Sequence, residues 1–361
     1  MKKLQCSLIA ALGLVACGPD PVTRASDTPW STKDQSAPTT FHGTAMTRGV
    51  PMLVDGSTVT ARALTLLQKA VESKEARLRA NAIESLRYAP LPILEKAIRV
   101  GLGDENRGVR FVASMMVGEV KVHDLIPLLE PLLLDDSDSV KASALCSIYK
   151  CGGSVDLNPL AIMLESDDPE LRGNIAMILG RIGNPSAVQM IRNASLTTPI
   201  TITPIRRRLI NLQMAEALVR LGEREELEVI RAAIFSSIQE AEVTALACQI
   251  AGRLHDVEIT STLQGITTTP ERYPDEIRLI AATALAEIDP NRVPMELVLR
   301  FTSNESANIR SQCATVLGVQ GNRLSLGPLA ILLTDIDPIV QIAAAGAVLR
   351  IDNGDSMVIV D

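Results

Sequence analysis

Apolar residues recur at helical spacing along most of the chain from about residue 73 onward. Each of nine segments contains an apolar anchor, and apolar or small residues follow it four and eight positions later, on the same face of a helix. The anchors are Leu78, Val109, Val140, Leu171, Ile210, Val243, Ile277, Ile309 and Val340, with spacings of 31, 31, 31, 39, 33, 34, 32 and 31 residues. The pattern predicts one amphipathic helix repeated nine times.

A second apolar run separates most successive anchor helices. These runs cover residues 125–134, 157–164, 187–191, 227–234, 259–266, 293–301 and 326–333. Each repeat is therefore expected to be a hairpin of two helices. One hairpin cannot bury its apolar faces, whereas a stack of hairpins can. The sequence predicts an all-α fold, an α-solenoid of about nine hairpins over residues 57–361.

Residues at the ends of the predicted helices fit their positions. Good N-cap residue types stand three positions before five anchors, at Asn106, Ser137, Asp168, Ser306 and Asp337. Pro169 and Pro338 follow two of them, at the first helical position, where a missing N–H costs nothing. Glycines stand nine positions after four anchors, at Gly118, Gly180, Gly252 and Gly318, and we expect them close to the turns that end these helices.

A basic residue directly after the anchor is the strongest evidence for the repeat. It is present in six of nine repeats, whereas 35 Lys and Arg among 361 residues would place about one there by chance. The six residues are Arg79, Arg110, Lys141, Arg172, Arg278 and Arg310.

The segment 168–180 reads Asp-Pro-Glu-Leu-Arg-x-x-Ile-Ala-x-x-Leu-Gly and resembles a HEAT repeat. The resemblance covers residues 57–351 and is nearest to the short bacterial, phycobilisome-lyase type of HEAT-like repeat. It implies that the second helices line the concave face. It also implies that the basic residues form a structural ladder with acidic groups of neighbouring turns, here Asp104, Asp135, Asp167 and Asp335. A basic ligand-binding stripe is the alternative.

The N-terminus has the pattern of an export signal. Lys2 and Lys3 precede an apolar run over residues 4–16, which predicts a signal peptide at residues 1–16 that is too short to span a bilayer. Residues 14–17 read Leu-Val-Ala-Cys and resemble the lipobox of bacterial lipoproteins. The resemblance implies that Cys17 becomes the lipidated first residue, carrying diacylglycerol and an acyl chain such as palmitate. Gly18, in place of Asp, implies an outer-membrane destination. An ordinary cleavage site with a coincidental Cys is the alternative.

Composition and charge limit the classes of partner. Hydrophobic residues make up 47% of the chain and aromatic residues 2%, which favours packed helices over sandwiches or barrels. Residues 17–56 are rich in Pro, Ser, Thr, Asp and Gly and are expected to be the lipidated Cys and a flexible linker. Loss of Lys2 and Lys3 leaves 33 basic against 42 acidic residues, a net charge of −9. Such a body has no electrostatic attraction for nucleic acid or anionic lipid, so membrane attachment is expected through the covalent lipid only.

Two segments interrupt the repeat. The 39-residue step contains 197–204 (Thr-Thr-Pro-Ile-Thr-Ile-Thr-Pro), followed by Arg206, Arg207 and Arg208, a dense basic cluster that is a possible partner-binding site. A solvated loop and helix start is the alternative. Near the C-terminus, the apolar residues 357–360 are expected to fold back over the last repeat, because solenoid ends need caps; a partner-facing edge is the alternative.

The sequence contains no pattern of catalytic or metal-binding residues that we could identify. Among the cysteines of the body, Cys248 and Cys313 fit core positions, while Cys146 and Cys151 are packed thiols or, alternatively, a disulfide. His123 and His255 fall in turns between repeats, and HExxH, GxSxG and GxxxxGK motifs are absent. We therefore expect no catalytic residue, no metal and no cofactor.

The function predicted from the sequence is that of a non-enzymatic envelope lipoprotein. Its HEAT-like surface would act as a protein-binding scaffold or assembly factor for other envelope proteins, at the outer membrane and facing the periplasm. The resemblance leaves a bilin-lyase-like enzyme as one alternative, although those lyases act on cytoplasmic proteins. A structural spacer without a specific ligand is the other.

Overall fold

The computed structural model describes residues 56–197 and 202–353. In these ranges the chain forms eighteen α-helices paired as nine antiparallel hairpins, and no β-strand. The predicted fold class is confirmed, and every anchor lies in the second helix of a hairpin.

The first helices of the nine hairpins are α1 (Gly56–Ala70), α3 (Leu91–Leu102), α5 (Ile126–Leu129), α7 (Asn158–Leu164), α9 (Ala187–Leu196), α11 (Leu227–Ala233), α13 (Thr260–Thr268), α15 (Met295–Phe301) and α17 (Leu326–Leu332). The second helices are α2 (Ala76–Ser85), α4 (Arg107–Val120), α6 (Asp138–Lys150), α8 (Pro169–Ile182), α10 (Pro204–Arg220), α12 (Ala241–Arg253), α14 (Asp275–Ile288), α16 (Ala307–Gln320) and α18 (Pro338–Asn353). Short 3₁₀ helices cover Leu86–Tyr88, His123–Leu125, Glu130–Leu134, Arg224–Glu226, Ile238–Glu240, Val257–Ile259, Pro290–Arg292 and Arg323–Ser325.

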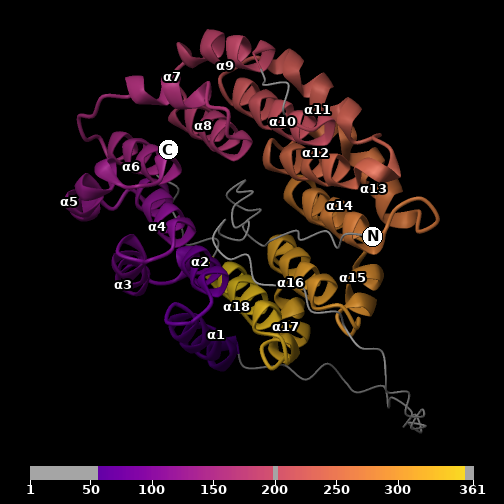
Figure 1. Cartoon of the computed structure of the whole chain (residues 1–361). Coiled ribbons are helices and arrows are strands. Elements are labelled where there is room, and N and C mark those ends of the chain that lie inside the picture. Colours follow the sequence, from indigo (N-terminus) through magenta and orange to yellow (C-terminus); the bar gives the residue numbers. More distant parts are fainter. Residues whose placement is uncertain (1–55, 198–201, 354–361) are drawn as a thin grey trace, which may run out of the picture.

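The nine hairpins form a closed ring. Figure 1 shows the second helices on the inside and the first helices on the outside, with α18 (yellow) beside α1 and α2 (indigo). Each second helix packs against the next, and the series closes because α18 packs against α2 while α1 packs against α17 and α18. The expectation of two solenoid ends that need caps is therefore wrong: each end of the stack covers the other. Residues 357–360 lie outside the described residues.

The seam between the last and first hairpins is part of the core. Val59, Ala63 and Leu67 of α1 are at most 1% exposed. A single cluster of buried apolar residues extends through the seam, joining residues 279–349 to residues 59–218. Hydrogen bonds add to the apolar contact, since Thr60 Oγ1 donates to Asp352 at 2.9 Å and Asn353 Nδ2 donates to the Tyr88 carbonyl at 3.1 Å. Burial of this kind is the main favourable term in folding, so the ring is closed by the same force that stacks the hairpins.

Four glycines predicted near turns have a different role. Gly118, Gly180, Gly252 and Gly318 lie in the last turn of their helices, close to the predicted turns, but none of them ends its helix. A Cβ on any of them would come within 2.8 Å of a backbone Cα of the next second helix. A Cβ on Gly180, for example, would lie 2.8 Å from Ala217 Cα. These glycines allow neighbouring second helices to approach closely.

The N-cap residues divide into two groups. The side chains of Asn106, Asp168 and Asp337 each accept a hydrogen bond from the backbone N–H two residues later, at 2.9 Å. Ser137 and Ser306 occupy the same position but make no such bond with their side chains. Their own N–H groups donate to the side chains of Asp135 and Asn304, at 2.9 Å. The N–H groups of Asn106 and Asp337 make the same kind of bond to the residue two positions earlier, so this bond is common to both groups.

The predicted signal peptide, Cys17 and the linker lie outside the described residues. Within residues 56–197 and 202–353, none of the helices has the length and hydropathy needed to span a bilayer.

Candidate functional site

Arginines at the start of three second helices connect neighbouring hairpins. Arg79 donates from Nε and Nη2 to Asp104 at 2.7 Å, and Arg310 makes the same pair of 2.7 Å bonds with Asp335. Arg110 donates to Asp135 at 2.7 and 2.9 Å. In each case the Asp lies in the turn of the following hairpin, 25 residues later.

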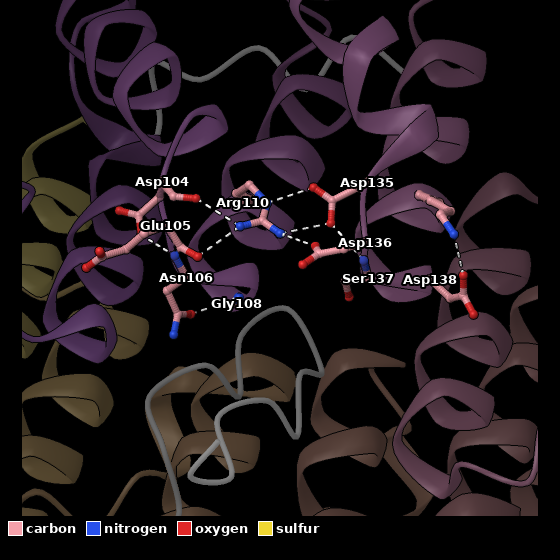
Figure 2. Close-up of polar contacts among 10 residues, drawn as sticks. Asp104, Glu105, Asn106, Gly108, Arg110, Asp135, Asp136, Ser137 and Asp138 are labelled. Carbon is pink, nitrogen blue, oxygen red and sulfur yellow. Dashed lines mark hydrogen bonds and ion pairs between the residues drawn. The ribbon is translucent and has the colours of Figure 1, made fainter. Parts of the chain in front are cut away.

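Figure 2 shows one such connection in full. Arg110 Nη1 donates to the carbonyls of Asp104 and Glu105 in its own turn, both at 3.0 Å, and the rest of its guanidinium reaches Asp135 and Asp136 of the next. Burial raises the pKa of Asp135, but the Arg110 guanidinium and the Ser137 N–H outweigh it and hold that pKa below its usual range. These bidentate, partly buried contacts have the geometry of strong charge-assisted hydrogen bonds.

The other three residues of the predicted structural ladder have different partners. Lys141 pairs with Asp138 of its own helix at 2.8 Å, and Arg278 binds Asp275 at 2.7 Å and the Thr267 carbonyl at 3.0 Å, all within one hairpin. Arg172 donates to the carbonyls of Ser166 and Ala194, so it reaches the next hairpin without a carboxylate. Asp167, the fourth acidic residue expected in the ladder, forms no ion pair with any of the six basic residues in the described part of the chain.

The arginine cluster lies at the start of α10. Arg208 is committed to the neighbouring hairpin, because it donates to Ser236 Oγ at 2.8 Å and pairs with Glu240 at 2.6 Å. Arg206 lies near Glu170, whose pKa is raised by burial despite the nearby positive charges of Arg107 and Arg206. Arg207 is exposed. The three side chains therefore lie in three different environments.

A second set of basic residues lies at the opposite end of the second helices, and the sequence analysis missed it. The position ten residues after the anchor is basic in five of nine repeats, at Lys150, Arg181, Arg220, Arg253 and Arg350. By chance, about one of nine repeats would have a basic residue at this position. The comparison with chance that supports the first basic position therefore supports this one as well. Together with Glu84, Arg87, Glu119, Glu216 and Glu287 they form what we call the inner belt. It carries six positive and four negative charges in a chain of net charge −7.

On one side of the ring the inner belt converges on Glu119. Arg87 of the first hairpin approaches it to 4.0 Å, Lys150 of the third approaches it to 3.6 Å, and Arg181 of the fourth donates a hydrogen bond to it. Burial favours a raised pKa for Glu119, but the charges of Arg181, Lys150 and Arg87 hold that pKa below its usual range. Glu119 and Arg181 are 62 residues apart, and their contact spans the hairpin between them.

On the other side of the ring, the pKa values of two buried glutamates are shifted in opposite directions. Glu216 binds Arg220 at 2.9 Å and Arg253 at 2.6 Å, and these charges overcome burial and lower its pKa to about 2. Glu287 has Arg253, Arg350 and His255 nearby, yet burial prevails and raises its pKa.

A central cavity of about 160 Å³ opens beside these groups, between α2, α12, α14, α16 and α18. Its charged lining consists of Glu84, Arg87, Arg253, Glu287 and Arg350, all members of the inner belt. The cavity depends on the seam, because α2 belongs to the first hairpin and α18 to the last.

The four cysteines of the described residues are all buried. Cys146, Cys151, Cys248 and Cys313 are buried free thiols, so the alternative of a disulfide between Cys146 and Cys151 is wrong. Burial raises the pKa of Cys146 to about 11 and the pKa of Cys248 to about 12, values typical of unreactive thiols. Over residues 56–197 and 202–353, no three His, Cys, Asp or Glu side chains are grouped to hold a metal ion.

The comparisons with known proteins concern the fold. Residues 63–148, which span most of the first three hairpins, match the family model for HEAT repeats. No curated protein matches the chain. Among solved structures, the chain is similar to the CpcE–CpcF complex of phycocyanin lyase from Nostoc (15% identity, TM-score 0.40), covering 78% of this chain and 98% of that one.

Two other solved structures illustrate the range of proteins with this kind of similarity. Human deoxyhypusine hydroxylase is 14% identical with a TM-score of 0.35, over 82% of this chain and 98% of that one. The karyopherin Kap121p is 15% identical with a TM-score of 0.34, over 79% of this chain and 37% of Kap121p.

Proposed function

We propose that the protein is a non-enzymatic scaffold of the bacterial envelope. In this proposal a lipid on Cys17 anchors it to the outer membrane, residues 17–56 act as a tether, and the ring of HEAT-like hairpins binds another envelope protein in the periplasm. The lipobox at residues 14–17 and the HEAT-repeat match at residues 63–148 support the two halves of the proposal.

The observation that carries the proposal is a group of exposed apolar residues beside the arginine cluster. Leu196 is 85% exposed, Phe235 is 58% exposed and Ile238 is 59% exposed. Leu196 ends the first helix of the fifth hairpin, α9. Phe235 and Ile238 lie between the two helices of the sixth hairpin, where Arg208 of α10 binds Ser236 and Glu240. We call Leu196, Arg206, Arg207, Phe235 and Ile238 the docking patch.

The docking patch has the composition of a protein-binding surface. Aromatic and arginine side chains are enriched in the residues that dominate binding energy, and exposed apolar groups mark interaction sites. The exposed guanidinium of Arg207 specifies the partner further, because it favours an acidic group at the rim of the partner's apolar surface. The patch is formed by two hairpins whose relative position is set by the ring, so it is organised before binding.

The proposal is tested by crosslinking in cells, followed by purification from detergent-solubilised membranes and mass spectrometry. We expect one stoichiometric envelope protein with the wild-type chain, and its loss with the double variant Phe235→Asp, Arg207→Glu. The matched control is Leu324→Asp, which changes a leucine that is 78% exposed. Leu324 lies in the turn between the eighth and ninth hairpins, whereas Phe235 lies in a turn within a hairpin. This control is expected to keep the partner.

A second arm tests the anchor. The Cys17→Ser variant should leave the membrane fraction, and its crosslinks to the envelope protein should fall with it. A protein that stays in the membrane fraction after Cys17→Ser would refute the lipid anchor. Absence of a reproducible partner from the wild-type chain would refute the scaffold and leave the structural spacer.

A further inference from the structure

The central cavity contains polar groups that the fold itself does not satisfy. Asn81 is 2% exposed and lines the cavity from α2, and neither its Oδ1 nor its Nδ2 has a hydrogen-bond partner in the described part of the chain. Gln312 lines the same cavity from α16, and its buried Oε1 also has no partner there. A buried amide without a partner destabilises the fold because it has lost its hydrogen bonds to water, so the presence of two calls for an explanation.

The chemistry of these groups indicates what would satisfy them. A primary amide offers a donor and an acceptor side by side, and a peptide group presents the complementary acceptor and donor. Asn81 and Gln312 lie on either side of α18, which runs between α2 and α16. A peptide chain that crosses the cavity can therefore meet both amides, one after the other.

The charge of the inner belt favours an anion. The lining brings Arg87, Arg253 and Arg350 together with Glu84 and Glu287, and Arg253 is also paired with Glu216. The inner belt is positive in an otherwise acidic chain. In a concave site with low-dielectric walls, such a local excess of one sign attracts the opposite charge strongly.

The size of the cavity limits the form of the ligand. Its volume of about 160 Å³ is close to the ~150 Å³ of a cavity that holds one benzene-sized molecule, so one or two residues of an extended segment enter it and a folded domain does not. The remaining lining includes apolar surface from Ile280, Ala284 and Val319, which suits small aliphatic side chains between the charged ones.

We propose that the central cavity is a binding site for an extended, acidic peptide segment of a partner protein. Carboxylates of the segment pair with Arg87 and Arg350, while Arg253 stays paired with Glu216, and its peptide groups bind the amides of Asn81 and Gln312. This inference rests on the proposed function only in taking the ligand to be a polypeptide; it does not depend on the lipid anchor or on the docking patch.

The test uses the purified, detergent-solubilised full chain and fluorescence anisotropy. The probe is a fluorescein-labelled octapeptide of alternating Glu and Ala. Octapeptides of alternating Gln and Ala and of alternating Lys and Ala are the controls for charge. We expect saturable binding of the Glu-Ala peptide alone, weakened by added salt because the contacts are ionic.

Two variants locate the binding in the cavity. Arg350→Gln removes a cavity arginine that lies over the Tyr88 ring, and it should raise the dissociation constant about fivefold, the effect of losing one ion pair of ordinary strength. Arg99→Gln, which removes an exposed charge from the outer helix α3, is the matched control and should leave the dissociation constant unchanged.

Asn81→Leu separates binding from a purely structural role. If the amide serves a ligand, replacing it with an apolar side chain of similar size should leave the melting temperature unchanged or raised, while the dissociation constant rises about fivefold. A fall in melting temperature without any loss of peptide binding would show that Asn81 serves the fold, and would overturn the assignment.

Other results would overturn the proposal as a whole. One is that the Gln-Ala peptide binds as tightly as the Glu-Ala peptide, and another is that the Glu-Ala peptide does not bind. A third is that Arg350→Gln and Asn81→Leu both leave the dissociation constant of the Glu-Ala peptide unchanged. Binding seen only after deletion of residues 354–361 would identify the occupant as the chain's own C-terminal segment and would equally overturn it. Peptide binding without a crosslinked partner in cells would refute the scaffold alone, and the reverse result would refute the cavity site alone.

Discussion

Basic residues recur near the start and near the end of the second helices, and the two sets have different kinds of partner. At the start of the helix, Arg79, Arg110 and Arg310 bind an aspartate of the next turn, always 25 residues away. At its end, Arg181 and Arg253 reach glutamates 62 and 37 residues away, on the inside of the ring. The first set makes contacts between neighbouring hairpins, which any stack of these hairpins would make. In the second set Arg253 likewise contacts the neighbouring hairpin. Arg181 passes over one hairpin to reach Glu119, and that contact depends on the curvature that brings the ends of several helices together.

The difference shows how one repeat supplies both stability and a site. The contacts at the helix starts repeat with the sequence, so they behave as nearest-neighbour terms of a one-dimensional stack. The inner belt places similar residue types in a confined space, where their charges interact across hairpins and beside a cavity. The largest effects of mutation are therefore expected in the inner belt.

The most disruptive single change should be Glu216→Ala. Glu216 is buried between Arg220 and Arg253, and its removal leaves the Arg253 guanidinium, which is 11% exposed, without its main partner. Breaking one side of a buried pair costs about 3–5 kcal/mol of unfolding free energy. Urea denaturation followed by circular dichroism measures the loss. Glu228→Ala, at an exposed ion pair with Arg231 on the outer helix α11, is the control and should cost under about 1 kcal/mol.

Acidification tests the same glutamate without removing its bulk. Because the pKa of Glu216 is about 2 in the folded protein and near 4.5 when unperturbed, its stabilising contribution is complete above pH 4.5. It is lost as the pH falls from about 4.5 to 2. Between pH 5 and pH 2 the wild type should lose about 3 kcal/mol more than Glu216→Gln, measured by denaturation at each pH. Parallel pH profiles for the two proteins would contradict this assignment.

Mutations at the helix starts should lower the free energy of unfolding less than Glu216→Ala does. Arg110 and Lys141, which both directly follow an anchor, allow a comparison at the same position of the repeat. Arg110→Ala leaves the 6% exposed Asp135 carboxylate without its bidentate partner and should cost about 2 kcal/mol. Lys141→Ala removes only an ion pair with the half-exposed Asp138 of its own helix. It should lower the free energy of unfolding by at most about 0.5 kcal/mol. Thermal unfolding of both variants measures the comparison. Equal losses would show that the contact with the next hairpin adds nothing.

The fold could be predicted because its signals are local. Anchor spacing, apolar periodicity and the basic residue after the anchor identified all nine second helices, and the aspartates at 104, 135 and 335 were expected from the family resemblance. The expectation for Asp167 failed because Lys141, whose register would bring it to that turn, pairs with Asp138 of its own helix. The role of the four glycines could not be told from the sequence, because a glycine required for close helix contact looks the same in sequence as one that ends a helix.

The candidate sites were only partly accessible to sequence reasoning. Arg206, Arg207 and Arg208 stand out in the sequence, but their separate environments depend on the loop at 236–240. The basic position ten residues after the anchor was present in the sequence and was overlooked. Asn81 could not have been singled out, since its significance lies in having no partner beside a cavity that two distant hairpins complete.

The sequence by itself determined the repeat, the hairpins and the order in which they stack, because each depends on residues within one period of about 31. Only the tertiary structure decided that the stack closes. Closure is the sum of small rotations set by close contacts such as Gly180 against Ala217, and it brings α1 against α18 over nearly the full length of the chain. With closure come the apolar seam at Val59, Ala63 and Leu67, the converging charges of the inner belt and the central cavity. No period of the sequence encodes them, because each requires residues from the two ends of the stack or from several turns at once.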